Sequence, residues 1–398
     1  MTDPIAYIPY GSGFSSPFAK WQGSLSAAHA LELAAASVRS KTGDMGLDTE
    51  AIDLGVLGTT VPQRGAFYGL PWLASMAGLG GLTGPTIAQA CATGARVLAT
   101  AARSVAGGEA ATVLCVTADR TSNSPHIYYP NPSAPGGVGE TEDWILANFD
   151  ADPATGKAMV ETAENVAGRY GISKEEQDDI TLLRYAQYGK ALGDDRAFQR
   201  RYMLPLEVGR GRRALTLEAD EGIAPADEGK IRALAPVRDG GTVSYAGQTH
   251  PADGHAGLLV TSEARARELS KDGIKVELLG FGQARTEPAF MPEAPVPASR
   301  RALERAGLSS DDLNLVTSHN PFAVNDAVFS RELGFPLDRM NTYGSSLVFG
   351  HPQAPTGMRL IVELIEALVI DGGGYGLFQG CAAGDSAMAV VLKVDSWR

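Results

Sequence analysis

The sequence predicts an α/β fold in which one unit occurs twice. The pattern Gly-Leu-x-x-acid-x-Ile/Leu-Asp/Asn-Leu occupies residues 46–54 and recurs at residues 307–315, an offset of 261 positions. In each copy the pattern follows an amphipathic helix and leads into an apolar strand. The later strand-like segments 111–116 and 374–380 also correspond. With 398 residues, of which 44% are apolar, the chain can bury a large core in two or three structural units.

The order of the predicted elements gives two halves separated by an insertion. We place the first half at residues 1–118, the insertion at 119–250, the end of the first half at 251–270 and the second half at 271–398. The insertion opens with a loop rich in proline and glycine. It then turns helical, because residues 173–176 have the Ser-Lys-Glu-Glu pattern of a capping box.

Composition and charge indicate a soluble enzyme. The net charge is −12 and the pI is about 5.0, which disfavours nucleic acid and anionic membranes as general partners. Three cysteines are too few for a disulfide framework and favour a reducing compartment. No apolar run reaches membrane-spanning length, and residues 1–4 do not resemble a signal peptide. We therefore expect a cytoplasmic protein with no membrane partner.

Cys91 is the first candidate nucleophile. It follows a Gly-Pro turn and precedes a run of small residues that ends at Gly107-Gly108, so a buried helix begins at or near Cys91. A helix N-terminus favours the thiolate and would lower the pKa of this thiol from its free value of ~8.5. Taken alone, the motif also fits a small core residue, as does Cys115 in the middle of an apolar strand.

His351 and Cys381 are the other two candidate reactive groups. The repeat offset places Cys91 opposite position 352, so Cys91 and His351 occupy nearly equivalent loops that would meet across a pseudo-twofold axis. A histidine before proline is held on an extended backbone, and its ordinary pKa suits a general base. Cys381 lies in a turn between two apolar strands. Each of these two motifs alone also fits ordinary turn chemistry.

Taken together, these segments resemble the thiolase family over nearly the whole chain. The motifs in question are the nucleophile motif at Cys91, Thr162-Ala163-Glu164-Asn165 with Glu176-Gln177-Asp178, Ala252-Asp253-Gly254, Pro297-Ala298-Ser299, Phe322-Ala323, Gly350-His351-Pro352 and Cys381. Several motifs in the right order are more specific than any one of them. The resemblance implies a duplicated five-layer α/β/α/β/α core, with the insertion as a loop domain that covers coenzyme A.

The resemblance also implies a mechanism. His351 would take the proton of Cys91, and the thiolate would attack an acyl-CoA to give an acyl-enzyme. Cys381 would then move the α-proton of acetyl-CoA, so that a C–C bond forms or breaks by Claisen chemistry. The backbone N–H groups of Cys91 and Ala383 would form one oxyanion site. His351 would form the other with His319, which stands where many thiolases have asparagine.

Substrate and assembly follow from the same resemblance. Coenzyme A and acyl-CoA are expected as substrates in fatty acid or other lipid metabolism, with no permanently bound cofactor and with a homodimer or homotetramer as the assembly. Thr249 matches a position near the pantetheine arm, and Arg210, Arg212 and Arg213 are candidates for the phosphates. No metal site is expected, because histidine and cysteine never fall at ligand spacing. Two alternatives stay open: an enzyme for an unusual acyl-CoA, and a scaffold of the same fold without turnover.

Overall fold

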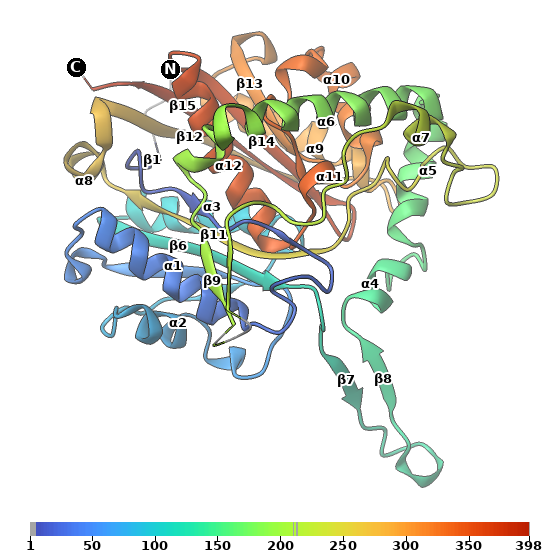
Figure 1. Cartoon of the computed structure of the whole chain (residues 1–398), viewed down its shortest axis with the longest axis horizontal. Coiled ribbons are helices and arrows are strands. Elements are labelled where there is room, and N and C mark those ends of the chain that lie inside the picture. Colours follow the sequence, from blue (N-terminus) through green and yellow to red (C-terminus); the bar gives the residue numbers. More distant parts are fainter. Residues whose placement is uncertain (1–4, 210, 212–213, 398) are drawn as a thin grey trace.

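The computed structural model describes residues 5–209, 211 and 214–397. Two α/β halves lie against each other, the first coloured blue to cyan with β11 in yellow and the second orange to red (Figure 1). Their strands form one sheet in the order β13-β14-β15-β12-β1-β11-β6-β4-β5, and β2 and β3 also pair with β11. Short β1 joins the halves, because it pairs antiparallel with both β11 and β12. The bounds are β1 (Ala6–Tyr7), β2 (Phe14–Ser15), β3 (Ala19–Lys20), β4 (Leu54–Gly58), β5 (Thr86–Ile87), β6 (Thr112–Arg120), β11 (Ala252–Thr261), β12 (Ile274–Arg285), β13 (Leu313–His319), β14 (Gly374–Ala382) and β15 (Ser386–Ser396).

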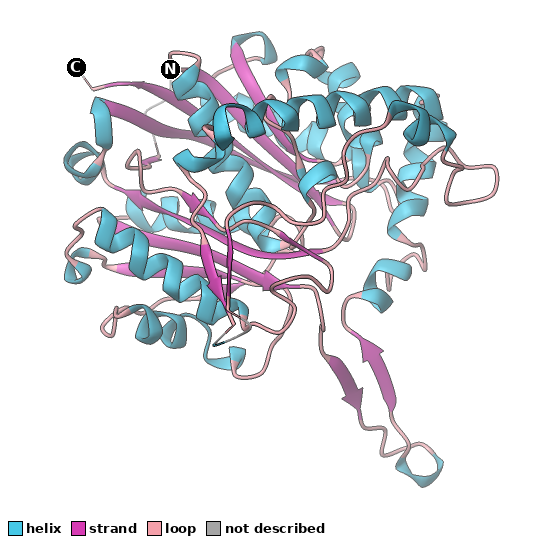
Figure 2. Cartoon of the chain, viewed as in Figure 1, coloured by secondary structure: helices cyan, strands magenta, loops and turns pink. Residues whose placement is uncertain are grey.

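Helices lie on both outer faces and between the two groups of strands (Figure 2). On the first half, α1 (Ala30–Asp44) and α2 (Gly69–Ala77) pack into one apolar cluster with the outer face of β4 and β6. On the second half, α9 (Pro295–Ala306) and α10 (Ala323–Leu333) pack into another apolar cluster with the strands of that half. Between the halves, α3 (Thr93–Ala106) and α12 (Ala354–Ile370) are buried together in a third cluster. The result is the five-layer α/β/α/β/α arrangement that the sequence predicted.

The repeated sequence pattern has the same structure in both copies. Gly46 and Gly307 follow the helices α1 and α9 and have φ values of +60° and +67°, a left-handed conformation that glycine adopts without a steric penalty. A 3₁₀ turn comes next in each copy, Thr49–Ala51 and Ser310–Asp312, followed by β4 or β13. The periodicity of the sequence therefore identified two equivalent helix-turn-strand units.

The chain between β6 and β11 contains a hairpin and several helices. Strands β7 (His126–Tyr129) and β8 (Glu140–Asp143) project from the body (Figure 1). They are followed by α4 (Leu146–Asp150), α5 (Met159–Tyr170), α6 (Lys174–Arg196), the pair β9 (Leu206–Val208) and β10 (Leu215–Leu217), and α7 (Glu228–Ala233). Helices α5 and α6 pack against α10 of the second half.

The predicted capping box at the start of α6 forms only in part. Ser173 Oγ accepts a hydrogen bond from the Glu176 backbone N–H at 3.2 Å, as a serine N-cap should. The Glu176 carboxylate, in contrast, pairs with Arg331 of α10. A tertiary ion pair thus takes the side chain that the local sequence assigned to the helix end.

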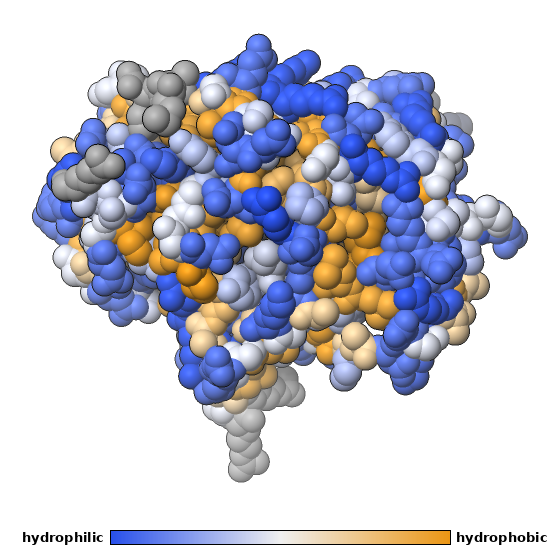
Figure 3. Space-filling view, turned by 90° about the horizontal axis from the view of Figure 1, so that it is seen from above, coloured by the Kyte–Doolittle hydropathy of each residue, from blue (hydrophilic) through white to orange (hydrophobic). Residues whose placement is uncertain are grey.

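The surface has the polar character that the net charge of −12 predicts. On the face shown in Figure 3, polar side chains cover most of the surface and apolar residues emerge in patches between them. None of the helices in the described part of the chain has the length and apolar character needed to span a bilayer.

Candidate active site

Cys91 lies in the tight loop that leads into α3. Thr93, the first residue of the helix, fixes this loop: its hydroxyl donates to the Ala90 carbonyl at 2.7 Å and accepts from the Gln89 N–H at 2.8 Å. Ala90 has a φ of +43°, which is uncommon for a residue other than glycine. The helix begins two residues after Cys91, so the half-buried thiol stands just ahead of its N-terminus.

His351 faces the thiol from the equivalent loop before α12. Its backbone N–H donates to the His250 carbonyl at 2.8 Å. Its ring Nδ1 lies 2.6 Å from the hydroxyl of Thr356, a residue of the first turn of α12. This contact fixes the ring, and His351 Nε2 is buried without a hydrogen-bond partner. The side chain therefore presents one free ring nitrogen toward the site.

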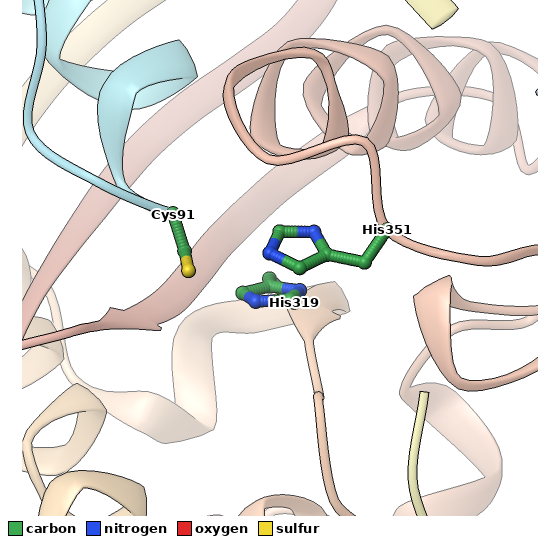
Figure 4. A group of neighbouring side chains, drawn as sticks. All are labelled: Cys91, His319 and His351. Carbon is green, nitrogen blue, oxygen red and sulfur yellow. The ribbon is translucent and has the colours of Figure 1, made fainter. Parts of the chain in front are cut away.

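His319, the last residue of β13, completes the cluster in Figure 4. Its ring stacks on His351 with centroids 4.0 Å apart and planes 27° apart. Nδ1 lies 3.0 Å from Ser346 Oγ, and Nε2 is buried without a partner. One donor atom from each of Cys91, His319 and His351 lies within 4.8 Å of the others. The two halves of the fold thus bring together three residues that are far apart in the sequence.

Cys381 is fully buried near the end of β14. Its sulfur accepts a hydrogen bond from Asn325 Nδ2 at 3.3 Å, and Asn325 belongs to the first turn of α10. Burial raises the pKa of the Cys381 thiol, and the Cys91 sulfur raises it further, so the two thiols are electrostatically coupled. Cys381 therefore holds its proton firmly at neutral pH.

The charge state of the site differs from the prediction. Burial raises the pKa of Cys91 to about 11, and the N–H groups of Ala383 and of Cys91 itself offset this only in part. The predicted lowering by the helix N-terminus was wrong, because desolvation of the thiolate outweighs the attraction of the backbone donors. Burial and the neighbouring His319 hold the pKa of His351 well below its usual range, and burial lowers that of His319 to about 3. Cys91, His319 and His351 are therefore all uncharged at neutral pH, and His351 is already in its basic form.

A cavity of about 620 Å³ opens onto Cys91, His351 and Ala383. Its walls are mostly apolar, with a small number of polar groups, as is usual for a small-molecule site. The other residues that line it are Thr60, Ala88, Ala90, Glu142, Trp144, Ile145, Asn148, Phe149, Asp150, Ala158, Met159, Val160, Arg238, Tyr245, Gln248, Thr249, His250, Pro251, Met291, Pro321, Phe322 and Gln353.

Two protein-family models match the two halves of the chain that form this site. The model of the thiolase N-terminal domain matches residues 12–264, and the model of the thiolase C-terminal domain matches residues 273–394. The chain belongs to the thiolase family. This confirms the resemblance seen in the sequence motifs.

Several relatives of this thiolase-family chain match it over nearly its whole length. Acetyl-CoA acetyltransferase IB of Candida tropicalis is 30% identical over 412 aligned positions, covering 100% of this chain and 99% of the relative. The 3-oxoadipyl-CoA/3-oxo-5,6-dehydrosuberyl-CoA thiolase of Escherichia coli is 29% identical and covers 96% of this chain and 98% of its own. The crystal structure of the Bacillus anthracis acetyl-CoA acetyltransferase superposes with a TM-score of 0.90 at 25% identity, over 99% of this chain and 100% of that one.

The structure describes only one of the four residues that the sequence suggested for binding coenzyme A. Thr249 lines the cavity of this thiolase fold, and its hydroxyl donates to the Ser346 carbonyl. Arg210, Arg212 and Arg213 lie outside the described residues. Arg238, which the sequence did not single out, is a cavity-lining cation.

The sequence predicted no metal site, because histidine and cysteine do not fall at ligand spacing along the chain. Such spacing carries no information about residues that the fold brings together. Cys91, His319 and His351 converge with one donor atom each within 4.8 Å of one another. No local spacing in the sequence reveals this convergence.

Asp119 also supports the site and was missed in the sequence. It lies near the end of β6, and its carboxylate accepts from the N–H groups of Thr60, Val61 and Ala354 at 2.8 to 3.0 Å. Burial raises the pKa of Asp119 to about 6, and the same hydrogen bonds oppose this rise. Because Ala354 begins α12, this one carboxylate of the first half fixes the helix that follows His351. A lone aspartate at a strand end carries no sequence signal for such a role.

Proposed function

We propose that this chain is an acetyl-CoA C-acyltransferase that cleaves a 3-ketoacyl-CoA with coenzyme A, or forms it by the reverse Claisen condensation, through an acyl-Cys91 intermediate. The observation that supports this most is the meeting of a thiol, a neutral imidazole and two backbone N–H donors at one cavity, with a second thiol coupled to the first. A neutral thiol and a neutral base can exchange a proton without an external acid or base.

In the first step, His351 Nε2 takes the proton of Cys91 and the thiolate attacks the C3 carbonyl of the 3-ketoacyl-CoA. Negative charge develops on the C3 oxygen. The N–H groups of Cys91 and Ala383 favour the thiolate form of the Cys91 sulfur, and the C3 oxygen would form beside the same donors. Donors fixed before the reaction stabilise such charge most effectively.

In the second step the C2–C3 bond breaks and its electron pair passes to the enolate of acetyl-CoA. The Cys381 thiol gives its proton to C2, a role that suits a thiol with a raised pKa. The stacked His319 and His351 rings carry unpartnered Nε2 atoms, which as N–H groups can donate to the enolate oxygen.

In the third step coenzyme A releases the acyl group. The Cys381 thiolate takes the proton of the CoA thiol, the CoA sulfur attacks the thioester, and the departing Cys91 thiolate recovers its proton from His351. Every proton is then back at its starting position.

The acetyl-CoA acetyltransferases at about 30% identity support an acyl-CoA substrate, as does the fold shared with a human mitochondrial 3-ketoacyl-CoA thiolase solved in complex with CoA.

Intact-mass measurement after exposure to acetyl-CoA or to acetoacetyl-CoA tests this proposal. We expect an acetyl adduct that maps to Cys91, is discharged by free CoA and is absent in Cys91→Ser. A folded protein that gains no adduct from either compound would contradict the proposal. An adduct from another acyl-CoA would then favour an enzyme for an unusual substrate, and no adduct at all would favour a scaffold.

A further inference from the structure

A glutamine side chain lies beside the nucleophile and its base. Gln353 Oε1 accepts a hydrogen bond from the Cys91 thiol at 3.2 Å, and the same side chain lies close enough to His351 to oppose in part the lowering of the His351 pKa by burial. Gln353 is only 5% exposed and lines the cavity. Its Nε2 atom is buried without a hydrogen-bond partner, as is Nε2 of His351. Unpaired buried donors and acceptors are rare and call for an explanation.

The backbone at Gln353 is held in an unusual conformation. Its φ and ψ are +67° and −109°, a region that residues with a side chain seldom adopt. The next residue, Ala354, donates its N–H to Asp119 Oδ2 at 3.0 Å, and Thr356 donates its N–H to the Gln353 carbonyl at 3.2 Å. These bonds fix the strained turn at the start of α12 and direct the carboxamide at Cys91. Strain retained at a reactive site is a reason to look for a function.

We propose that Gln353 is a further catalytic residue that stabilises the thiolate–imidazolium pair formed when Cys91 gives its proton to His351. The proton passes from Sγ to Nε2 of His351, and the carboxamide turns about its last side-chain bond. Its NH₂ group then donates to the thiolate, and its oxygen accepts from the new N–H of His351. This inference rests on the proposed function only in that acyl transfer is the reason for forming the ion pair. The ion pair itself can form without acyl-CoA.

The physical reason is that both new charges would form in a buried site, beside one carboxamide that lies next to Cys91 and two residues after His351. Burial opposes the charged forms of both Cys91 and His351. A carboxamide carries a donor and an acceptor on one rigid group, so a single rotation can satisfy a neighbouring anion and cation together. The two Nε2 atoms that lack partners in the resting site both gain one in the ion pair. Hydrogen bonds to ionised groups are stronger than those between neutral groups.

Alkylation of Cys91 by iodoacetamide between pH 6 and 10, without any CoA compound, tests this role. Gln353→Met keeps the length of the side chain and removes both polar atoms, while Gln353→Gly accepts the positive φ without strain. We expect both variants to react on the order of tenfold to a hundredfold more slowly than the wild type at neutral pH. The rates should converge at alkaline pH, where solvent hydroxide forms the thiolate, because access to the sulfur is unchanged.

Gln379→Met is the matched control. Gln379 is also a buried glutamine whose polar side-chain atoms have no partner, but it lies in β14 outside the cavity, so its replacement should leave the alkylation profile unchanged. Folding of each variant is checked by circular dichroism. A wild-type pH profile in both Gln353 variants would overturn the inference, as would equal slowing at all pH values. Failure of the proposed acyl transfer would instead appear as absent acylation of the wild type, with the effect on alkylation intact.

Discussion

The Cys91 thiol and the His351 imidazole are both uncharged at pH 7, because burial moves their pKa values in opposite directions. Charge would arise on these two residues mainly during reaction, which makes the neighbouring N–H donors and the Gln353 carboxamide important to their chemistry. The local motifs of the sequence singled out Cys91, His319 and His351, and the fold brings these three residues together. The sequence could not identify the pKa values of these residues, or the roles of Asp119 and Gln353. Both depend on contacts between chain segments that are more than two hundred residues apart.

The raised pKa of Cys91 predicts how its reactivity depends on pH. With a pKa of about 11, the thiolate fraction in the free protein falls tenfold for each unit of pH below that value. The rate of alkylation by iodoacetamide should therefore rise steadily toward pH 10 from the low, pH-independent rate near neutral pH that a minor thiolate–imidazolium pair supports. A rate near pH 7 equal to the rate at pH 10 would mean that this pair is the main form of the free protein, and would contradict the neutral resting site.

Replacing the second thiol separates acylation from proton transfer. Cys381→Ala should still be acetylated at Cys91, yet lose overall thiolytic turnover by roughly 10²-fold or more, the usual effect of removing a general acid or base. Cys115→Ala is the control, because Cys115 is an equally buried cysteine in the middle of β6. Turnover is followed by the loss of acetoacetyl-CoA absorbance. Full turnover without the Cys381 thiol would exclude its proposed role.

At the scale of elements, α12 links the site to the segment between β10 and α7. Arg359 of α12 is fully buried and binds both oxygens of Asp220 at 2.6 and 2.7 Å. Asp220 also accepts from the Phe18 N–H, and Glu363 pairs with Arg359 on its other side. The sequence predicted the insertion that contains Asp220. It could not show that the insertion and α12 share a buried ion pair, because Arg359 and Asp220 are 139 positions apart.

The Arg359 cluster predicts a large loss of stability on substitution. Asp220→Asn leaves the buried Arg359 without its bidentate partner and should cost about 3–5 kcal/mol of unfolding free energy. Asp227→Asn is the control, because Asp227 is half-exposed and caps α7, and asparagine caps a helix equally well. Its cost should stay below about 0.5 kcal/mol. Urea unfolding measures both values, and similar costs at the two sites would show that the buried pair contributes no more than a surface one.

At the scale of the whole molecule, the site exists only because two equivalent halves meet. Cys91 and His351 come from corresponding loops, and the helices that follow them, α3 and α12, pack against each other. The two helices approach closely at Gly94, where an added Cβ would lie 2.5 Å from the Met358 backbone nitrogen and 2.9 Å from the Ala354 carbonyl oxygen. A run of small residues in the sequence indicated a buried helix, but only the fold shows which backbone it touches.

This contact predicts that one methyl group will separate the two reactive groups. Gly94→Ala must push α3 away from α12, since the obstructing atoms belong to the backbone, and overpacking of this kind costs about 1–3 kcal/mol. Because α3 follows Cys91 and α12 follows His351, the shift should also slow acetylation of Cys91 by roughly 10²-fold, the effect of a misplacement of about 1 Å. Gly43→Ala is the matched control. Gly43 lies in α1 with nothing within 4 Å of an added Cβ, so alanine there should raise stability by about 0.5–1 kcal/mol and leave acetylation unchanged. Unchanged acetylation in Gly94→Ala, measured by intact mass alongside urea unfolding, would mean that the distance between the halves does not control the reaction.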